Sequence, residues 1–220
     1  LKLVDMIGLD YDDPKWDQLL DQMTYDDMVA LVADSFHWTM PIESIQAPGT
    51  RDENGPQGLT TALFGAHLGV ETTALTSEDV LAATFNKDLV YEIGNIVGND
   101  CLAADVACLY GPGANTHRTP YGGRNFEYFS EDPYLAGKMA AAYVRGIQAN
   151  GVAACPKHFA VNSQELRRMS MNSVLDERTM REIYLTGFEI AVKEGRAKTI
   201  MSSYNMVNGT YANENEHLLK

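Results

Sequence analysis

The sequence predicts an α/β fold in which strands and helices alternate, and it favours a (β/α)8 barrel over an open doubly wound sheet. Three short apolar segments, residues 106–110, 152–155 and 199–201, are bounded by Gly, Pro and polar residues, as strands buried on both faces are. Polar side chains follow all three, and amphipathic helical patterns fill the intervals. Because ligands bind at the carboxyl ends of strands in both folds, these polar ends predict an active-site rim. Their presence after every successive strand favours the barrel.

The first part of the chain predicts an interrupted helix followed by loops. Apolar residues recur at helical spacing over residues 14–33, and Asp13 is placed to cap this helix ahead of a proline at its first position. The helix is expected to break near residues 24–26. Residues 36–69 are rich in Gly, Pro, Thr and Gln and lack periodicity, which predicts long loops of a size that is usually functional.

Two helices are predicted before the first strand. One starts near Ser77, because two acidic residues follow it and suit a helix N-terminus. The next covers about residues 87–102, with Asn86 as its cap. The strand at residues 106–110 then follows directly.

Two further helices separate the remaining strands. The first begins at residues 130–133 and ends at Asn150-Gly151, ahead of the strand at residues 152–155. The second opens at Asp176 and stops at Gly195, before the third strand. The strands therefore recur at even intervals, which fits repeated units of strand, loop and helix.

The composition excludes several classes of protein. A formal net charge of -13 argues against nucleic-acid binding, which needs a basic surface, and also disfavours anionic membranes. No apolar run approaches the roughly 20 residues of a membrane span. The cysteines, Cys101, Cys108 and Cys155, are too few and too widely spaced for a disulfide framework or a zinc site, so buried free thiols are expected. The lack of disulfides favours a bacterial cytoplasm.

Both ends of the sequence suggest a longer protein. The first residue is Leu1 rather than Met, and residues 216–219 are typical of the opening of another helix. We therefore expect a partial (β/α)8 TIM-like barrel, truncated at both ends. Residues 1–49 are assigned to a lead-in helix and linker, and residues 50–220 to the N-terminal part of the barrel domain.

The pair Lys157-His158, at the end of the second predicted strand, is the strongest candidate for chemistry. Lysine is rarely buried without a partner, and a Lys beside a His at a strand end can donate hydrogen bonds to the hydroxyls of a polyol. Two alternatives stay open: an ordinary solvated strand end, and a Schiff-base lysine in an aldolase-like barrel.

An arginine after two glycines is the second candidate. Arg124 follows Gly122-Gly123, where the backbone can turn tightly, and its guanidinium can clamp vicinal hydroxyls or a carboxylate. The alternative is an Arg paired with Glu127 or Glu131 on a loop surface. Gly111-Pro112-Gly113 is not a phosphate loop, because the proline removes an N–H and no GxGxxG pattern follows.

Four ordered motifs together resemble the barrel domain of family 3 glycoside hydrolases, in particular the β-glucosidase branch. The resemblance runs from about Thr50 to the C-terminus, and a Gly- and His-rich loop typical of the N-acetylglucosaminidase branch is absent after Lys157-His158-Phe159. The motifs are residues 111–115, 122–133, 157–159 and 201–205, with Asn162, Gln164 and Glu165 after the third.

The resemblance implies a subsite for the sugar that is cleaved off. Arg124, Lys157 and His158 match the family's hydroxyl-binding residues. Arg168 and Tyr204 match positions that support the nucleophile and the sugar, and Met201 matches a residue lining the same pocket. Asn54 stands where the family usually has an Asp, and its neutral amide makes weaker hydrogen bonds than a carboxylate does.

The two carboxyl groups of a retaining glycosidase are not expected on this chain. The resemblance places the nucleophilic Asp beyond Lys220 and the acid/base in a second α/β domain, which the lead-in segment suggests lies upstream. Glu127, Glu131 and Glu165 match structural positions rather than catalytic ones. The isolated chain is therefore expected to be inactive and poorly soluble.

The resemblance thus implies a retaining exo-β-glucosidase that hydrolyses terminal non-reducing β-D-glucosyl residues of a small β-glucoside or oligosaccharide. No metal or cofactor is implied. Two alternatives stay open: a β-xylosidase, because Asn54 and Thr60 depart from the family pattern, and a non-catalytic sugar-binding relative.

Overall fold

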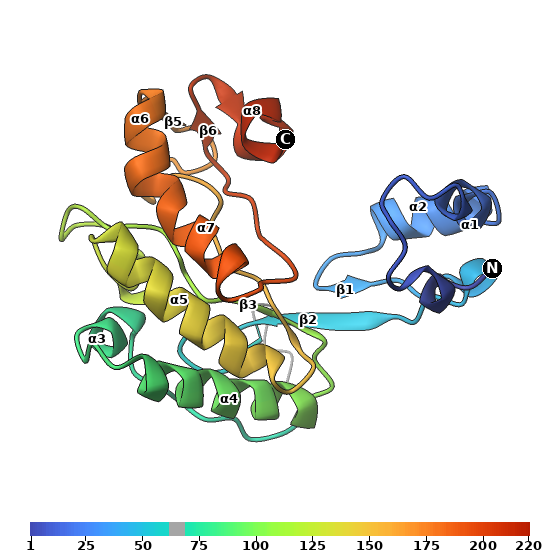
Figure 1. Ribbon diagram of the computed structural model, residues 1–220, viewed down its shortest axis with the longest axis horizontal. Helices are drawn as coiled ribbons and strands as arrows, with labels where there is room; N and C mark the ends of the chain where they lie inside the picture. Colours follow the sequence, from blue (N-terminus) through green and yellow to red (C-terminus); the bar gives the residue numbers. More distant parts are fainter. Residues whose placement is uncertain (62–68) are drawn as a thin grey trace. The chain divides into compact units, whose positions relative to one another are not determined.

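The computed structural model in Figure 1 describes residues 1–61 and 69–220. The chain divides into two compact units, Leu1–Asp52 and Glu53–Lys220. The expected assignment of residues 50–220 to a barrel domain stays a prediction. None of the helices among the described residues is long and apolar enough to cross a membrane.

The first unit contains the interrupted helix that the sequence predicts. A 3-10 turn, η1 (Leu3–Met6), precedes α1 (Lys15–Leu20) and α2 (Tyr25–Ala33). The break between the helices is confirmed, because Thr24 caps α2 by accepting a hydrogen bond from the Asp27 amide at 3.1 Å. The small core of this unit consists of Met6, Leu19, Ile42 and Ile45.

A β-hairpin occupies part of the segment predicted as loops, so that prediction is wrong here. β1 (Trp38–Thr39) pairs antiparallel with β2 (Thr50–Asn54), with Trp38 opposite Arg51, and the short helix η2 (Glu43–Ile45) lies between them. Backbone pairing defines these strands, and their polar residues carry no alternating pattern to reveal them. Residues 62–68 of the predicted loops lie outside the described residues.

The second unit begins with the three predicted helices, α3 (Glu78–Ala82), α4 (Lys87–Ala103) and α5 (Pro133–Gln148). Asn86 caps α4, and α4 and α5 lie side by side (Figure 1). Glycines permit this close packing, because a Cβ at Gly94 would stand 2.4 Å from the Tyr143 carbonyl oxygen. The unit's main core includes Val90, Val97, Leu109, Met139 and Ile147.

Two of the three predicted strands form, and they pair in parallel. β3 (Cys108–Tyr110) lies beside β4 (Ala153–Ala154), with Cys108 opposite Ala153. The third prediction, a strand at residues 199–201, is wrong: that segment is irregular, and a single bridge joins Phe159 to Ser202. The Thr199 hydroxyl donates a hydrogen bond to the Ala154 carbonyl oxygen at 3.0 Å. In a regular sheet, a backbone N–H would occupy that carbonyl.

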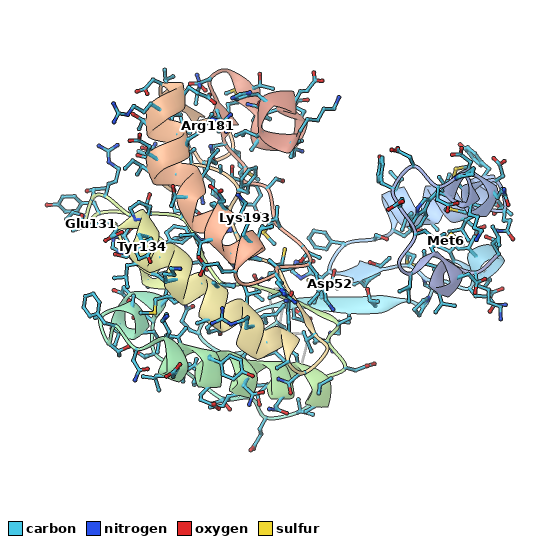
Figure 2. All side chains as sticks on the ribbon, viewed as in Figure 1. Met6, Asp52, Glu131, Tyr134, Arg181 and Lys193 are labelled. Carbon is cyan, nitrogen blue, oxygen red and sulfur yellow. The ribbon has the colours of Figure 1, made fainter. Side chains whose placement is uncertain are left out.

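The last predicted helix is present but contains a π-helical turn. It consists of α6 (Glu177–Thr179), η4 (Met180–Leu185) and α7 (Thr186–Lys193), and α7 packs against α5 (Figure 1). Arg181 and Lys193 lie on the exposed surface of this segment (Figure 2). The remaining elements are the 3-10 turns η3 (Asn125–Glu127) and η5 (Ala212–Glu214), the strands β5 (Asn172–Ser173), β6 (Met206–Val207) and β7 (Thr210–Tyr211), and α8 (Glu216–Leu219).

Candidate functional site

A pocket of about 430 Å³ brings together three of the seven predicted site residues, Asn54, Arg124 and Lys157. Its other walls come from the turn after β2 and from η3. The lining also includes residues 55–60 and 72–74, Phe126 and Glu127.

Lys157 forms the charged floor of this pocket. Lys157 is only 2% exposed. This excludes the alternative that Lys157-His158 is an ordinary strand end in contact with solvent. The ammonium donates to Asn54 Oδ1 at 3.2 Å and lies 3.4 Å from Glu127 Oε2. Burial lowers the pKa of Lys157, while Glu127 opposes that shift. The backbone beyond β4 fixes its position, since the Lys157 amide donates to the Pro112 carbonyl at 3.0 Å.

Arg124 shares its counterion with Lys157. Its guanidinium pairs with Glu127 Oε1, and a second carboxylate, that of Glu165, lies 4.0 Å away. The pairing with Glu127 considered as the alternative is therefore present, but the Glu127 side chain is 5% exposed and so does not lie on a loop surface. Glu131, the other candidate partner, is exposed at the start of α5 (Figure 2).

His158 lies buried behind the pocket, with 3% of its surface exposed. Its Nδ1 is 3.0 Å from the Tyr128 hydroxyl, and its amide donates to Asn115 Oδ1 at 2.5 Å. Burial, followed by the nearby charges of Arg124 and Lys157, lowers the pKa of His158 to about 2. The imidazole is therefore neutral at any ordinary pH.

Arg168 and Tyr204 form a second group. The Arg168 guanidinium donates to Glu165 Oε2 at 2.8 Å and stacks 4.7 Å from the centre of the Tyr204 ring. Tyr204 lines another pocket, of about 560 Å³, beside Ser202 and Ser203.

Met201 is tied to the strand end that carries Lys157 by its backbone. Its amide donates to the Pro156 carbonyl at 3.0 Å, and its carbonyl accepts from the Phe159 amide at 2.7 Å. The seven predicted residues thus fall into a pocket group, the buried His158, a stacked pair and a backbone neighbour. Glu165 lies between the pocket group and the stacked pair, within 4.0 Å of Arg124 and 2.8 Å of Arg168.

Glu78 is a buried carboxyl group whose place in the site the sequence did not indicate. It is 0% exposed, and its oxygens accept from the Gly113 amide at 3.0 and 3.3 Å. Burial, then the nearby charge of Glu127, raises the pKa of Glu78 well above its ordinary value. In the sequence it served only as an acidic residue at a helix start, and nothing local marks it as buried.

Tyr128, Asn162 and Glu165 were also not predicted as site residues, although all three stand in the quoted motifs. Asn162 Nδ2 lies 3.1 Å from the Tyr128 hydroxyl and 3.0 Å from Glu165 Oε1. Their positions in those motifs were the only signal in the sequence. The contact between Asn162 and Tyr128 joins residues 34 positions apart, which only the fold reveals.

The arrangement suits recognition of a neutral, hydroxyl-rich ligand. Arg124 and Lys157 present charge-assisted donors, and the carboxylates of Glu127 and Glu165 offset their charge. The Asn54 amide offers both donor and acceptor groups. Among residues 1–61 and 69–220, no three His, Cys, Asp or Glu side chains are grouped so that they could hold a metal ion.

Comparison with known proteins gives a consistent family. The sequence profile of the glycosyl hydrolase family 3 N terminal domain matches residues 62–220. Thermostable beta-glucosidase B of Acetivibrio thermocellus is 43% identical over 208 residues, covering 92% of this chain and 28% of that protein. Beta-glucosidase B of Emericella nidulans is 40% identical over 205 residues, covering 93% of this chain and 24% of its own length.

Solved structures agree with the sequence comparison. Beta-glucosidase 3B from Thermotoga neapolitana, in complex with alpha-D-glucose, aligns with a TM-score of 0.84 at 40% identity, over 94% of this chain and 31% of its own. Beta-glucosidase from Kluyveromyces marxianus, in complex with glucose, aligns with a TM-score of 0.86 at 40% identity, over 92% of this chain and 24% of its own. The chain thus spans between about a quarter and a third of the length of these relatives. The likeness supports the expected α/β barrel fold.

Proposed function

The chain belongs to glycosyl hydrolase family 3, and we propose that it supplies the sugar-binding part of a retaining exo-β-glucosidase. The substrate would be a small β-glucoside or oligosaccharide with a terminal non-reducing β-D-glucosyl residue. One observation carries the proposal: Asn54, Arg124 and Lys157 converge on a single pocket above the buried Glu127. The relatives are named beta-glucosidases, and the structures of two of them are complexes with glucose; both facts support the choice of sugar.

The pocket residues act as hydroxyl ligands in this proposal. Arg124 can span two neighbouring hydroxyls with its planar fork, and Lys157 can donate to a third from the floor. Glu127 already holds both cations in place, so their side chains lose little conformational freedom when the sugar binds. The Tyr204 ring, stacked under Arg168, offers an apolar face to the sugar.

We propose that both catalytic carboxyl groups come from sequence outside residues 1–220, with the acid/base on a second α/β domain. A retaining glycosidase needs a nucleophile and an acid/base about 5 Å apart. Glu127 and Glu165 are each engaged by cationic side chains, and Glu78 is closed off from solvent. This pairing supports structural roles for Glu127 and Glu165.

Two other functions compete with this proposal. A β-xylosidase is favoured by Asn54, whose neutral amide replaces the family's usual Asp at a hydroxyl contact. A non-catalytic sugar-binding relative would keep the same pocket.

The relatives come from both bacteria and fungi, so the location in a bacterial cytoplasm stays a prediction.

The deciding experiment uses the complete protein with aryl β-glucoside and aryl β-xyloside as substrates. We expect faster hydrolysis of the glucoside, and Lys157→Met should lower kcat/KM on it by about a hundredfold or more, since a charge-assisted bond and the partner of Glu127 are lost together. Lys138→Met removes a lysine from an exposed ion pair with Glu194 and serves as the matched control.

The other outcomes identify the alternatives. Preference for the xyloside would replace the glucosidase by a xylosidase. Glucose binding without hydrolysis would leave a sugar-binding relative. Trapping of a carbonyl substrate on Lys157 by borohydride would establish the Schiff-base alternative and overturn the proposal.

A further inference from the structure

A line of hydrogen-bonded polar groups, half-buried at one end and buried at the other, has no place yet in the proposed function. It starts at Glu165, whose Oε1 lies 3.0 Å from Asn162 Nδ2. Asn162 Nδ2 lies 3.1 Å from the Tyr128 hydroxyl, and that hydroxyl lies 3.0 Å from His158 Nδ1. The order of donors and acceptors along this line follows from one fixed end.

Glu165 is the fixed end, because its carboxylate accepts hydrogen bonds and donates none. Arg168 donates a hydrogen bond to its other oxygen, Oε2, at 2.8 Å. The Asn162 atom facing Glu165 must therefore be the amide nitrogen rather than the oxygen. This orientation leaves Asn162 Oδ1 buried without a hydrogen bond to any described residue, which costs free energy. The flipped orientation is worse, because it would place Oδ1 against the carboxylate of Glu165.

Asn162 in turn orients the Tyr128 hydroxyl. One amide hydrogen goes to Glu165, and the other is left for the Tyr128 oxygen, which accepts it. The hydrogen of Tyr128 then has His158 Nδ1 as the only acceptor among the described residues that bond this hydroxyl. Burial raises the pKa of Tyr128 above its ordinary value, so this hydrogen stays in place.

His158 Nδ1 is consequently an acceptor, and a neutral ring must carry its proton on Nε2. The ring stays neutral because it is buried and because Arg124, Lys157 and Arg168 surround it. No described residue within 1–61 and 69–220 forms a hydrogen bond with Nε2. This N–H therefore remains available for a ligand.

We propose that Tyr128 and Asn162 are positioning residues that hold the His158 ring with its proton on Nε2, as a donor to a hydroxyl of the bound sugar. The inference rests on the proposed function for the identity of the ligand. It deepens that function by making His158 a fixed donor rather than a titrating acid or base. The direction of each hydrogen bond in this line can be measured whether or not the protein is a glycosidase.

The first test reads the tautomer directly, with isotope-labelled histidine in the complete protein. Nitrogen chemical shifts differ strongly between a protonated and an unprotonated ring nitrogen, and His158→Gln identifies the signal that belongs to His158. We expect the proton on Nε2. In Asn162→Leu the Tyr128 oxygen no longer receives the amide hydrogen and can accept from His158 Nδ1, so the ring proton should distribute over both nitrogens. A proton on Nδ1 in the unmodified protein overturns the proposal whether or not the protein is a glycosidase.

The second test measures sugar recognition. Tyr128→Phe keeps the ring and removes one hydroxyl, and we expect about a tenfold weaker glucose affinity and a matching rise in KM, the loss of roughly one oriented hydrogen bond. Tyr184→Phe is the control, because its buried hydroxyl accepts from Arg118 and has no described bond to the line. Equal affinity in Tyr128→Phe and the unmodified protein overturns the proposal. If the unmodified protein neither binds glucose nor cleaves a glucoside, the proposed function fails while the tautomer measurement still decides the positioning role.

Discussion

At the scale of single residues, Glu127 holds the site together because the buried Lys157 and the half-buried Arg124 share its carboxylate. Arg124 contacts one oxygen and Lys157 lies 3.4 Å from the other. Removing one member of such a group leaves uncompensated charge where water cannot reach it, which costs more than the intact group contributes. The pocket therefore depends on a residue that need not touch the sugar.

Replacing Glu127 by Gln tests this role, since the shape is kept and the charge is lost. We expect the free energy of unfolding to fall by about 3 kcal/mol and glucose binding to weaken, because Arg124 and Lys157 then repel one another. Urea unfolding and glucose titration of the complete protein measure both effects. Glu189→Gln, in an exposed pair with Lys193, should change neither. A Glu127→Gln protein as stable as the unmodified one would show that the cations relax into solvent.

The neutral buried His158 predicts a pH dependence of stability. The folded ring takes up a proton only near pH 2, whereas in the unfolded chain its pKa has the ordinary value of 6.5. Below 6.5 the unfolded state binds the additional proton, so this residue lowers stability as the pH falls, by roughly 1.4 kcal/mol per pH unit. Urea midpoints at several pH values between about 7 and 4.5 measure the slope. His158→Gln should flatten it, and an unchanged slope in that variant would refute a neutral buried ring.

The sequence could indicate where the site lies but not how its parts connect. Arg124 and Lys157 could be named because they follow a tight turn and a strand, and Asn54 through the family resemblance; all three line one pocket. The hydrogen bond between Asn162 and Tyr128 could not be foreseen, since it joins residues 34 positions apart. Glu78 was invisible for the same reason: burial is a property of the packed chain.

At the scale of secondary structure, the packing of α4 against α5 supports the strand ends that carry the site. Two glycines make the contact close, one on each helix. A Cβ at Gly94 would lie 2.4 Å from the Tyr143 carbonyl oxygen, and one at Gly146 would lie 2.2 Å from that of Tyr91. Both obstacles are backbone atoms, which cannot turn aside as a side chain does.

Gly94→Ala should therefore destabilise the protein although alanine favours helix formation. The helices would have to separate, and we expect a loss of about 2 kcal/mol, as for other overpacked cores. The control is Glu92→Ala on the exposed face of the same helix, which should change stability by less than about 0.5 kcal/mol. Thermal or urea unfolding compares the two. Equal stability would mean that the helix contact is looser than the structure shows.

Helices were predictable here because their signals are local. The caps Thr24 and Asn86 and the helix-stopping Asn150-Gly151 all lie within a few residues of the ends they define. The strands β1, β5, β6 and β7 contain two residues each and are defined by backbone pairing rather than by a local pattern of residues. The predicted strand at residues 199–201 failed for the converse reason: its apolar residues suit a strand, but Thr199 uses its side chain to bond Ala154.

At the scale of the whole molecule, the proposed function gives this chain the recognition of the sugar and places the catalytic pair elsewhere. Glu127 is paired with Lys157, Glu165 is paired with Arg168, and Glu78 accepts a hydrogen bond from the Gly113 amide. The chain also spans only about a quarter to a third of its relatives' length. Recognition and bond cleavage are therefore expected to reside on different parts of the complete protein.

This division predicts the behaviour of residues 1–220 expressed alone. They should not hydrolyse an aryl β-glucoside at a rate above the background, whereas the complete protein should, because the nucleophile and the acid/base would be missing. Hydrolysis by the isolated residues that is lost in Glu165→Gln or Glu127→Gln would contradict the division and place a catalytic carboxylate on this chain. If residues 1–220 are inactive, their unfolding must also be measured. A cooperative transition would show that the chain is folded, so that the inactivity comes from the missing catalytic groups and not from a lost fold.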